Sequence, residues 1–463
     1  MKNMRKLCIE LFSLLNVALM TAPFAAAWYS YYGKLIISPY YNKGNWLVVF
    51  LFTVFYAVFG RVYDAFSISR TRVSELAYSQ SLSALISDVF MYVVIWLLSK
   101  ELCNPLPLLL CFTEQVLFSL LWAYISQKIY FALFAAKKTA VVYDMRPEVS
   151  ELILSSWMRK KYDIVVNMRV EECLENLEKL AGMDTVFLGG VHSHERNIIL
   201  KYCVEQDIEV FVLPRVGDVL MSGAEKIHMF HLPMLHATRY SPPTLYLVIK
   251  RLFDIFASAL GLLLFSPIFL VTAAAIKATD GGPVFYLQTR LTKDGKRFNV
   301  IKFRSMRVDA EKDGVARLST GTADERITPV GRIIRKIRVD ELPQLINILK
   351  GDMTVCGPRP ERPEIAAQYE EELPEFRLRL QAKAGLTGLA QVYGKYNSTP
   401  YEKLQMDLMY IANPSILQDL HLMFATIKIL FMPESTEGIE AGSVTALDGS
   451  KAGGETRADD GRR

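Results

Sequence analysis

The sequence offers little of what a disulfide framework or a zinc site requires. Its six cysteines are scattered over 463 residues, and none forms a Cys-x-x-Cys pair. Five of the six histidines fall between residues 192 and 236, but their spacings give no helical i, i+4 pair and no carboxylate partner. We therefore interpret them as surface histidines, and we expect neither structural zinc nor a disulfide-stapled fold.

The chain also lacks a basic run with interleaved aromatic residues, which argues against a nucleic-acid partner. Lysine and arginine total 53 against 48 acidic residues, and the cations lie largely beside apolar segments and in the C-terminal half. That distribution suits contact with membrane lipid headgroups and with phosphate-bearing substrates. A cleavable signal peptide is not expected, because the first apolar stretch runs into Trp28-Tyr29 without a small-residue cleavage site.

Long apolar runs, by contrast, fill residues 1–135. Four of them approach the roughly 20 helical residues that cross a bilayer core, and tryptophan and tyrosine gather at their ends. They predict an N-terminal membrane bundle of four α-helical spans. The four runs are Leu7–Tyr29, Trp46–Val62, Leu76–Leu98 and Pro105–Ile125.

Positive charge predicts the direction of these spans. Three groups of cations flank the bundle on what would be one side, whereas the other two connections carry only Lys34, Lys43 and Lys100. Under the positive-inside rule, the N-terminus and everything after residue 135 then lie in the cytoplasm. The three groups are Lys2, Arg5 and Lys6; Arg61, Arg70 and Arg72; and Lys128, Lys137 and Lys138.

Residues 136–240 alternate short apolar runs with helical patterns, which predicts a Rossmann-like α/β domain with a parallel sheet. The first turn of that sheet, residues 143–147, has no glycine, so the backbone cannot approach a pyrophosphate closely. We therefore expect a regulatory or assembly role for this domain rather than nucleotide binding.

A fifth apolar segment, Leu252–Ile276, is interrupted by Ser266-Pro267. Proline inside a helix removes a hydrogen bond, so the helix should kink or break there into halves of about 14 and 10 residues, each too short to cross a membrane. Cations precede and follow the segment. The sequence therefore predicts a re-entrant helix–break–helix that returns to the same membrane face, with a kinked fifth span as the alternative.

Six motifs follow between residues 280 and 431. Together with the preceding break, their order and spacing over residues 246–431 resemble the bacterial sugar transferase family of monotopic polyprenyl-phosphate sugar-1-phosphate transferases. The membrane bundle and middle domain resemble the longer branch of that family. The motifs are Gly282-Pro-Val-Phe-Tyr286, Lys302-Phe-Arg-Ser-Met306, Arg338-Val-Asp-Glu-Leu-Pro-Gln344, Gly357-Pro-Arg-Pro-Glu361, Gly385-Leu-Thr-Gly-Leu-Ala-Gln391 and Met406-Asp-Leu-Met-Tyr-Ile411.

Apart from any resemblance, the adjacent Asp340 and Glu341 suit phosphoryl transfer, which needs a nucleophile, a metal ligand and nearby cations. Pro343 in the first turn of a helix over Leu342–Leu349 would place both carboxylates at its positive end. The alternative is a solvated acid pair among surface charges. The nearby cations are Arg332, Arg335, Lys336 and Arg338.

The resemblance implies an α+β catalytic phosphoglycosyl transferase domain in the bacterial inner membrane, facing the cytoplasm. It implies that Asp340 attacks a UDP-sugar, that Glu341 binds Mg²⁺, and that undecaprenyl phosphate then takes the sugar phosphate. These are the first steps of exopolysaccharide, capsule or O-antigen assembly. The other functional positions that it implies are Lys302 and Arg335 as catalytic residues, and Arg304, Arg359, Lys395, Asp407 and Asp419 as substrate-binding residues.

Some expectations stay open. Lys395 stands where many relatives have arginine, so it keeps the charge but loses the bidentate fork. A structural salt bridge is the alternative role for Arg359. Residues 309–328 would form a mobile loop over the site, and residues 432–463 a disordered tail. The sugar is not distinguishable, and a homodimer is compatible with the resemblance. A catalytically silent scaffold is the rival to an enzyme.

Overall fold

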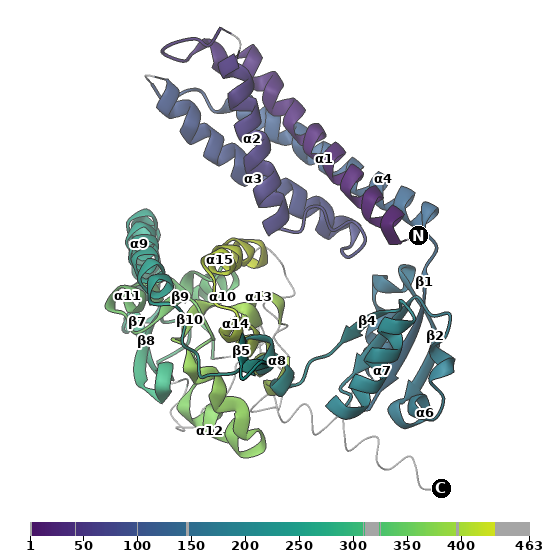
Figure 1. The fold of residues 1–463 in the computed structure, drawn as a ribbon. Helices are drawn as coiled ribbons and strands as arrows, with labels where there is room; N and C mark the ends of the chain where they lie inside the picture. The colour runs from purple at the N-terminus through teal and green to yellow at the C-terminus, as the bar shows by residue number, and fades with distance from the viewer. Residues whose placement is uncertain are drawn as a thin grey trace. The chain divides into compact units, whose positions relative to one another are not determined.

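The computed structural model describes residues 2–430, apart from residues 42, 100, 145–147, 309, 311–323, 325 and 395–397. The chain divides into two compact units, residues 1–213 and residues 214–463, which are described separately (Figure 1). The segment 432–463 and nearly all of the expected loop over residues 309–328 therefore lie outside the described residues.

Four long helices form the first part of unit one and lie alongside one another (Figure 1). Their inner faces bury aromatic residues such as Trp28, Phe52 and Tyr56, and Phe24 stacks on Phe52 with ring centroids 4.5 Å apart. The bounds are α1 Lys2–Ser30, η1 Tyr32–Lys34, α2 Lys43–Val62, α3 Val73–Leu98 and α4 Leu106–Leu133.

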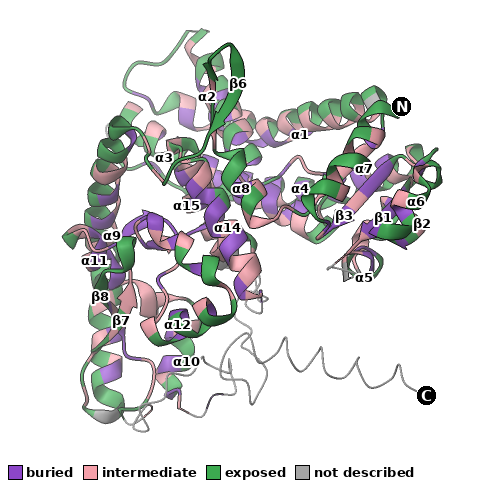
Figure 2. Cartoon of the chain, turned by 60° about the horizontal axis from the view of Figure 1, so that its bottom comes forward, coloured by how far each residue is buried: buried purple, intermediate pink, exposed green. Residues whose placement is uncertain are grey.

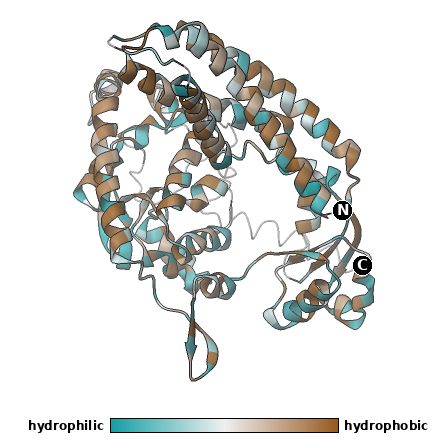
Figure 3. Cartoon of the chain, turned by 45° about the horizontal axis from the view of Figure 1, so that its top comes forward, coloured by the Kyte–Doolittle hydropathy of each residue, from teal (hydrophilic) through white to brown (hydrophobic). Residues whose placement is uncertain are grey.

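The outer faces of these helices are apolar as well, and Figure 3 shows them largely hydrophobic along their length. Such all-round hydrophobicity is typical of helices that face lipid. Among the described residues, α1 to α4 and α9 are long and apolar enough to cross a membrane. The crossing of four spans remains a prediction.

The rest of unit one is a parallel four-stranded sheet with strand order β2-β1-β3-β4, which confirms the expected parallel α/β arrangement. Ala140, Val141 and Val142 of β1 are all fully buried, as expected for a central strand covered on both faces. The elements are β1 Lys137–Tyr143, α5 Glu148–Ser155, η2 Trp157–Lys160, β2 Tyr162–Arg169, α6 Val170–Glu175, η3 Leu177–Leu180, β3 Thr185–Gly189, α7 Ser193–Glu205 and β4 Glu209–Val212.

Unit two begins earlier than the residue 240 expected for the end of the middle domain. Helix α8 (Val216–Ser222) packs on helix α14 (Pro400–Ala412), and Val219 belongs to the core of unit two. The hairpin of β5 (Glu225–Met229) and β6 (Leu232–His236) follows, and Figure 2 shows it exposed. Residues 214–240 thus belong with the C-terminal half of the chain.

The core of unit two joins helices to two short sheets, one antiparallel (β7 and β8) and one parallel (β9 and β10). This mixed architecture agrees with the expected α+β domain. The elements that follow α9 (Thr244–Asp280) are β7 Phe285–Leu291, η4 Lys293–Gly295, β8 Arg297–Phe303, α10 Pro329–Lys336, η6 Val339–Glu341, α11 Gln344–Lys350, β9 Thr354–Cys356, α12 Pro363–Glu372, η7 Pro374–Gln381, β10 Gly385–Thr387, α13 Leu389–Tyr393, α14 Pro400–Ala412 and α15 Ile416–Leu430.

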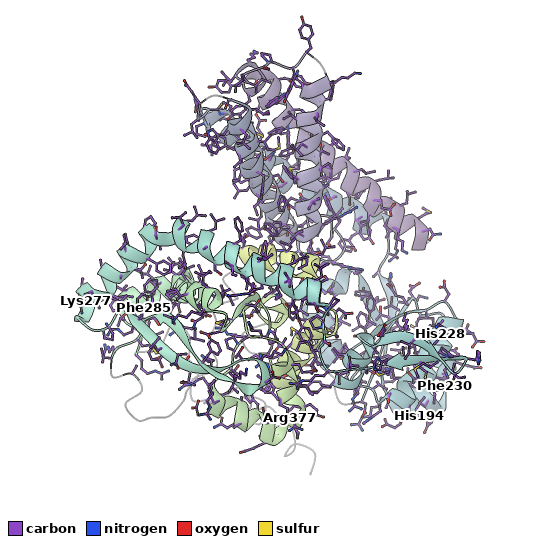
Figure 4. The ribbon with its side chains drawn as sticks, turned by 60° about the vertical axis from the view of Figure 1, so that its left-hand side comes forward. His194, His228, Phe230, Lys277, Phe285 and Arg377 are labelled. Atoms are coloured by element: carbon purple, nitrogen blue, oxygen red, sulfur yellow. The ribbon has the colours of Figure 1, made fainter. Side chains whose placement is uncertain are left out.

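Helix α9 corrects the expected break at Ser266-Pro267. The helix runs without interruption from Thr244 to Asp280 with Pro267 inside it, and Figure 4 shows it as one bent helix that ends near Lys277. Proline removes only one backbone hydrogen bond, so a bend suffices to accommodate it. The Ser266 hydroxyl donates to the Leu263 carbonyl at 2.8 Å, which supplies the turn before the proline with another hydrogen bond.

Both ends of α9 pack on the body of unit two. Near its start, Arg251 donates through Nη1 to the Ile348 carbonyl at 2.6 Å and through Nη2 to the Leu349 carbonyl at 2.8 Å, which caps the C-terminal end of α11. Near its end, Ile276 joins a buried cluster with Phe303 of β8 and Ile334 of α10. The middle of the helix is exposed and apolar.

Candidate active site

The adjacent carboxylates Asp340 and Glu341 lie on η6, a single turn between α10 and α11. Arg338 precedes them with a φ of 57°, a left-handed conformation that is costly for a side chain other than glycine. This residue redirects the chain after α10 and points the acid pair at the end of β8. The expected helix after Pro343 is present as α11, so both carboxylates do precede its N-terminal end.

Glu341 is held between two cations that come from different elements. Its Oε1 lies 3.2 Å from Nζ of Lys302, on β8, and 2.9 Å from Nη2 of Arg359, in the loop after β9. The side chains of Glu341 and Lys302 are 14% and 18% exposed, so this pair is largely buried, whereas the Arg359 side chain is 39% exposed. Burial alone would raise the pKa of Glu341, but Arg359, Lys302 and Arg338 together lower it well below its usual value.

Asp340 has the opposite shift. Burial raises the pKa of its carboxyl to about 6, and the neighbouring Glu341 adds to the rise, while Lys302 and Arg335 oppose it. Burial also lowers the pKa of Lys302, although Glu341 favours the charged ammonium. Two neighbouring carboxyls whose pKa values move apart are suited to different chemical roles.

Four of the expected site residues therefore meet at one place: Lys302, Asp340, Glu341 and Arg359. Arg335, in the last turn of α10, acts on Asp340 electrostatically. Lys395 lies outside the described residues.

Arg304 is expected to bind substrate, and the structure places it in the interior next to Gly282. Its side chain is buried, and its guanidinium lies so close to Gly282 that a Cβ there would fall 1.9 Å from Nη1. The backbone N–H of Arg304 donates to the Val284 carbonyl at 2.9 Å. Arg304 thus packs against the chain that enters β7, and Gly282 leaves the room that it needs.

Asp407, also expected to bind substrate, lies in the interior of unit two. It is 1% exposed, and its Oδ2 accepts from Nε of Arg379 at 2.8 Å. Arg379 in turn donates through Nη2 to the Arg359 carbonyl at 2.9 Å. Asp407 is therefore connected through Arg379 to the loop that carries Arg359, and its role toward substrate stays a prediction.

Asp419, on α15, fastens α9 rather than facing the acid pair. Its carboxylate accepts from Lys250 at 2.8 Å, from the Tyr246 hydroxyl at 2.9 Å and from the Tyr410 hydroxyl at 2.7 Å. Lys250 and Asp419 have side chains 12% and 8% exposed. This buried cluster anchors the start of α9.

Three residues that the sequence reasoning missed surround the loop after β9: Arg290, Glu361 and Arg379. Glu361 lies 3.8 Å from Arg290 and 3.7 Å from Arg379, measured between charged atoms. A signal was present in the loop itself, because a Pro-Arg-Pro segment has few N–H groups and must be held through its carbonyls. Which arginines would do so depends on contacts between distant parts of the chain.

The acid pair offers carboxylate oxygens of the kind that the expected magnesium prefers. Among the residues that the structure describes, no three His, Cys, Asp or Glu side chains gather as a ready-made metal site. Magnesium is usually bound by one or two carboxylates together with water and substrate phosphates. Both cations described on Glu341 contact the same oxygen, Oε1, so the ionised Glu341 beside Asp340 fits that mode of binding.

Comparisons with known proteins match the part of the chain that carries this site. The family model described as bacterial sugar transferase matches residues 245–433. The exopolysaccharide production protein PSS of Rhizobium leguminosarum bv. phaseoli is 43% identical over 190 residues, which cover 39% of this chain and 94% of the relative.

Two longer relatives are matched over about half of their length or less. The UDP-N-acetylgalactosamine-undecaprenyl-phosphate N-acetylgalactosaminephosphotransferase of Aeromonas hydrophila is 38% identical over 50% of this chain and 54% of the relative. The UDP-glucose:undecaprenyl-phosphate glucose-1-phosphate transferase of Klebsiella pneumoniae is 42% identical over 39% of this chain and 40% of the relative. With a short relative matched almost completely and the family model matched across the site, this chain belongs to the bacterial sugar transferase family.

Proposed function

We propose that this chain transfers a sugar 1-phosphate from a UDP-sugar to undecaprenyl phosphate and releases UMP. The observation that carries the proposal is the ion triad of Glu341, Lys302 and Arg359 beside Asp340, whose pKa is raised. The names of the two longer relatives describe phosphotransferases that act on undecaprenyl phosphate. The reaction would be the first membrane step of exopolysaccharide or capsule synthesis.

Asp340 is the nucleophile in this proposal. With a pKa of about 6 it is largely ionised at neutral pH. Its carboxylate oxygen attacks the phosphorus that bears the sugar, and the bond from that phosphorus to UMP breaks, so that UMP leaves with the electron pair. An oxygen of undecaprenyl phosphate then attacks the same phosphorus and releases Asp340 as a carboxylate.

Glu341 has a different task. Its low pKa and its two cationic partners make it a poor nucleophile but a permanently charged ligand. Glu341 would hold Mg²⁺, which when bound supplies positive charge to the diphosphate. Lys302 and Arg335 contribute further positive charge, and the planar guanidinium of Arg359 can bind phosphate oxygens in a bidentate way.

The setting is a membrane surface. Because both ends of α9 pack on the same unit and its middle is exposed and apolar, we propose that the helix dips into one leaflet of the inner membrane and returns to the cytoplasmic face. That arrangement holds the acid pair at the depth of a lipid phosphate. We also propose that the Rossmann-like sheet has a role in regulation or in forming a homodimer.

The test is UMP release by the purified chain in nanodiscs with Mg²⁺ and undecaprenyl phosphate, across a panel of UDP-sugars. One sugar should give UMP, and Asp340→Asn should lower the rate at least about 10³-fold. Chelation of Mg²⁺ should stop the reaction, and its return should restore it. The control is Glu375→Gln, which neutralises an exposed carboxylate on η7.

Two results would contradict the proposal in different ways. A fully active Asp340→Asn would remove the nucleophile assignment and leave the transfer itself intact. No UMP from any sugar, under conditions where a related enzyme works, would favour the scaffold alternative.

A further inference from the structure

The loop from Gly357 to Glu361 is held through its backbone oxygens. Pro358 and Pro360 have no N–H, so the loop can donate few backbone hydrogen bonds of its own. All four carbonyls from Pro358 to Glu361 nevertheless accept one. The donors are, in order, Gly385 N at 2.9 Å, Arg379 Nη2 at 2.9 Å, Arg290 Nη1 at 3.1 Å and Leu291 N at 3.0 Å.

Of the two arginine side chains among these donors, that of Arg379 is the more buried. Its side chain is 5% exposed, and its guanidinium lies 4.8 Å above the ring of Phe376. Nε donates to Oδ2 of Asp407 at 2.8 Å, and Nη2 lies 2.6 Å from the same oxygen. Because Nη2 carries two hydrogens, it serves both the Asp407 carboxylate and the Arg359 carbonyl.

The loop in turn supports the ion triad. The side chain of Arg359 leaves the clamped peptide and reaches Glu341 with 2.9 Å between Nη2 and Oε1. A displacement of the peptide by about 1 Å would open that contact, and displacements of this size are known to cost a hundredfold in rate. The position of the Arg359 carbonyl therefore decides where its guanidinium lies.

We propose that Arg379, oriented by Asp407, is a positioning residue that sets Arg359 against Glu341 by holding the Arg359 carbonyl. Its effect on turnover rests on the function proposed above, whereas its effect on the loop does not. Asp407 is then part of the machinery without touching the substrate.

The geometry requires arginine. Only a planar guanidinium can donate to the Asp407 carboxylate from Nε and Nη2 and still direct the second Nη2 hydrogen at the Arg359 carbonyl. Arg379→Lys keeps the charge opposite Asp407 but offers a single ammonium group. The matched control is Arg377→Lys, because Arg377 lies on the same 3₁₀ segment and its side chain is exposed (Figure 4).

The first measurement is amide hydrogen exchange of the full chain in nanodiscs. Between Pro358 and Glu361, only Arg359 and Glu361 carry an exchangeable backbone N–H. Arg379→Lys should speed their exchange, and Arg377→Lys should leave it unchanged. Unchanged exchange in Arg379→Lys would overturn the proposal, whatever the activity of the chain.

The second measurement is a double-mutant cycle on UMP release. Arg379→Lys should lower kcat about a hundredfold in the native background. In the Arg359→Ala background it should cost less than about twofold, because a residue that acts through Arg359 has nothing left to position. Equal losses in both backgrounds would overturn the proposal.

Other outcomes remain informative. If Arg379→Lys does not fold, Asp407→Asn serves instead, because it keeps an oxygen for Nε while weakening the hold on Arg379, and it should loosen the same loop. No loosening in Asp407→Asn would overturn the proposal. Faster exchange in a chain that releases no UMP from any sugar would confirm the positioning and reject the proposed function.

Discussion

At the scale of single residues, two neighbouring carboxyls acquire opposite properties from what surrounds them. Glu341 accepts from Lys302 and Arg359, so its charge is stabilised inside the protein. Asp340 is buried with less compensation and lies beside that negative charge, so its protonated form is favoured. A carboxylate whose charge is less stabilised is the better nucleophile, whereas one with a low pKa stays ionised, and so available as a ligand, over a wider pH range.

This difference predicts the pH dependence of the reaction. Asp340 must be ionised to attack, and its pKa is raised to about 6, so UMP release should fall as the pH decreases through about 6. Glu341→Gln removes the neighbouring charge that raises the pKa of Asp340. The acid limb of its residual activity should therefore move to lower pH.

Single-turnover rates between pH 4 and pH 8 would measure the acid limb of the native chain and that of Glu341→Gln. The control is again Glu375→Gln, whose midpoint should match that of the native chain. A native midpoint near pH 4 would mean that the Asp340 carboxyl titrates as it does in water.

The acid pair was predictable from sequence because its signal is local. Asp340, Glu341 and Pro343 lie within one turn and specify their own position before a helix. The partners of Asp407 and Asp419 were not predictable. Arg379 lies 28 residues from Asp407, and Lys250 lies 169 residues from Asp419, so only tertiary packing brings them together. The sequence marked those carboxylates as important without indicating what they touch.

At the scale of elements, α9 shows why a proline is a weak sign of a break. Lys250, Arg251 and Asp254 fix its first turns to unit two, and Ile276 fixes its last turns. With both ends held, the helix bends and keeps its remaining hydrogen bonds. The sequence indicated a break at Ser266-Pro267. The contacts that hold both ends of α9, and so leave only a bend, join residues far apart in the chain.

The topology of α9 predicts which membrane face its ends occupy. Leu245 and Thr279 lie near opposite ends of the helix and are exposed. In a chain with Cys8→Ser, single cysteines at these two positions should react with a membrane-impermeant maleimide from the same, cytoplasmic side, because both ends belong to one folded unit. The remaining native cysteines are buried.

Tyr41→Cys provides the control for sidedness. It lies in the connection between α1 and α2 and is fully exposed, and the four-span prediction places it on the opposite face. Reaction of Leu245→Cys and Thr279→Cys from opposite faces would make α9 a fifth span.

At the scale of the whole molecule, the residues that meet at the proposed site all lie in unit two. Its buried core runs from Val219 on α8 to Leu422 on α15, and the family match lies within the same unit. A relative matched over 94% of its length by 190 residues shows that a protein of this family can consist of little more than that part.

Residues 214–433 alone should therefore release UMP at a rate within about threefold of the full chain, because a domain with its own core can fold independently. The control is residues 240–433, which lack α8 and so expose the core around Val219. That shorter piece should melt at a lower temperature. If residues 214–433 lose activity but keep the melting temperature of unit two in the full chain, unit one takes part in the reaction.

The hydrogen bonds from Arg251 to the end of α11 predict where loss-of-function mutations will be found in this chain. The same short helix follows the acid pair at one end and is hydrogen-bonded to α9 at the other. A genetic screen for loss of product should thus recover alleles in α9, although α9 carries none of the residues that meet at the acid pair. A position in this chain should tolerate mutation poorly when its contacts help to fix Asp340 in place, even if it lies far from Asp340.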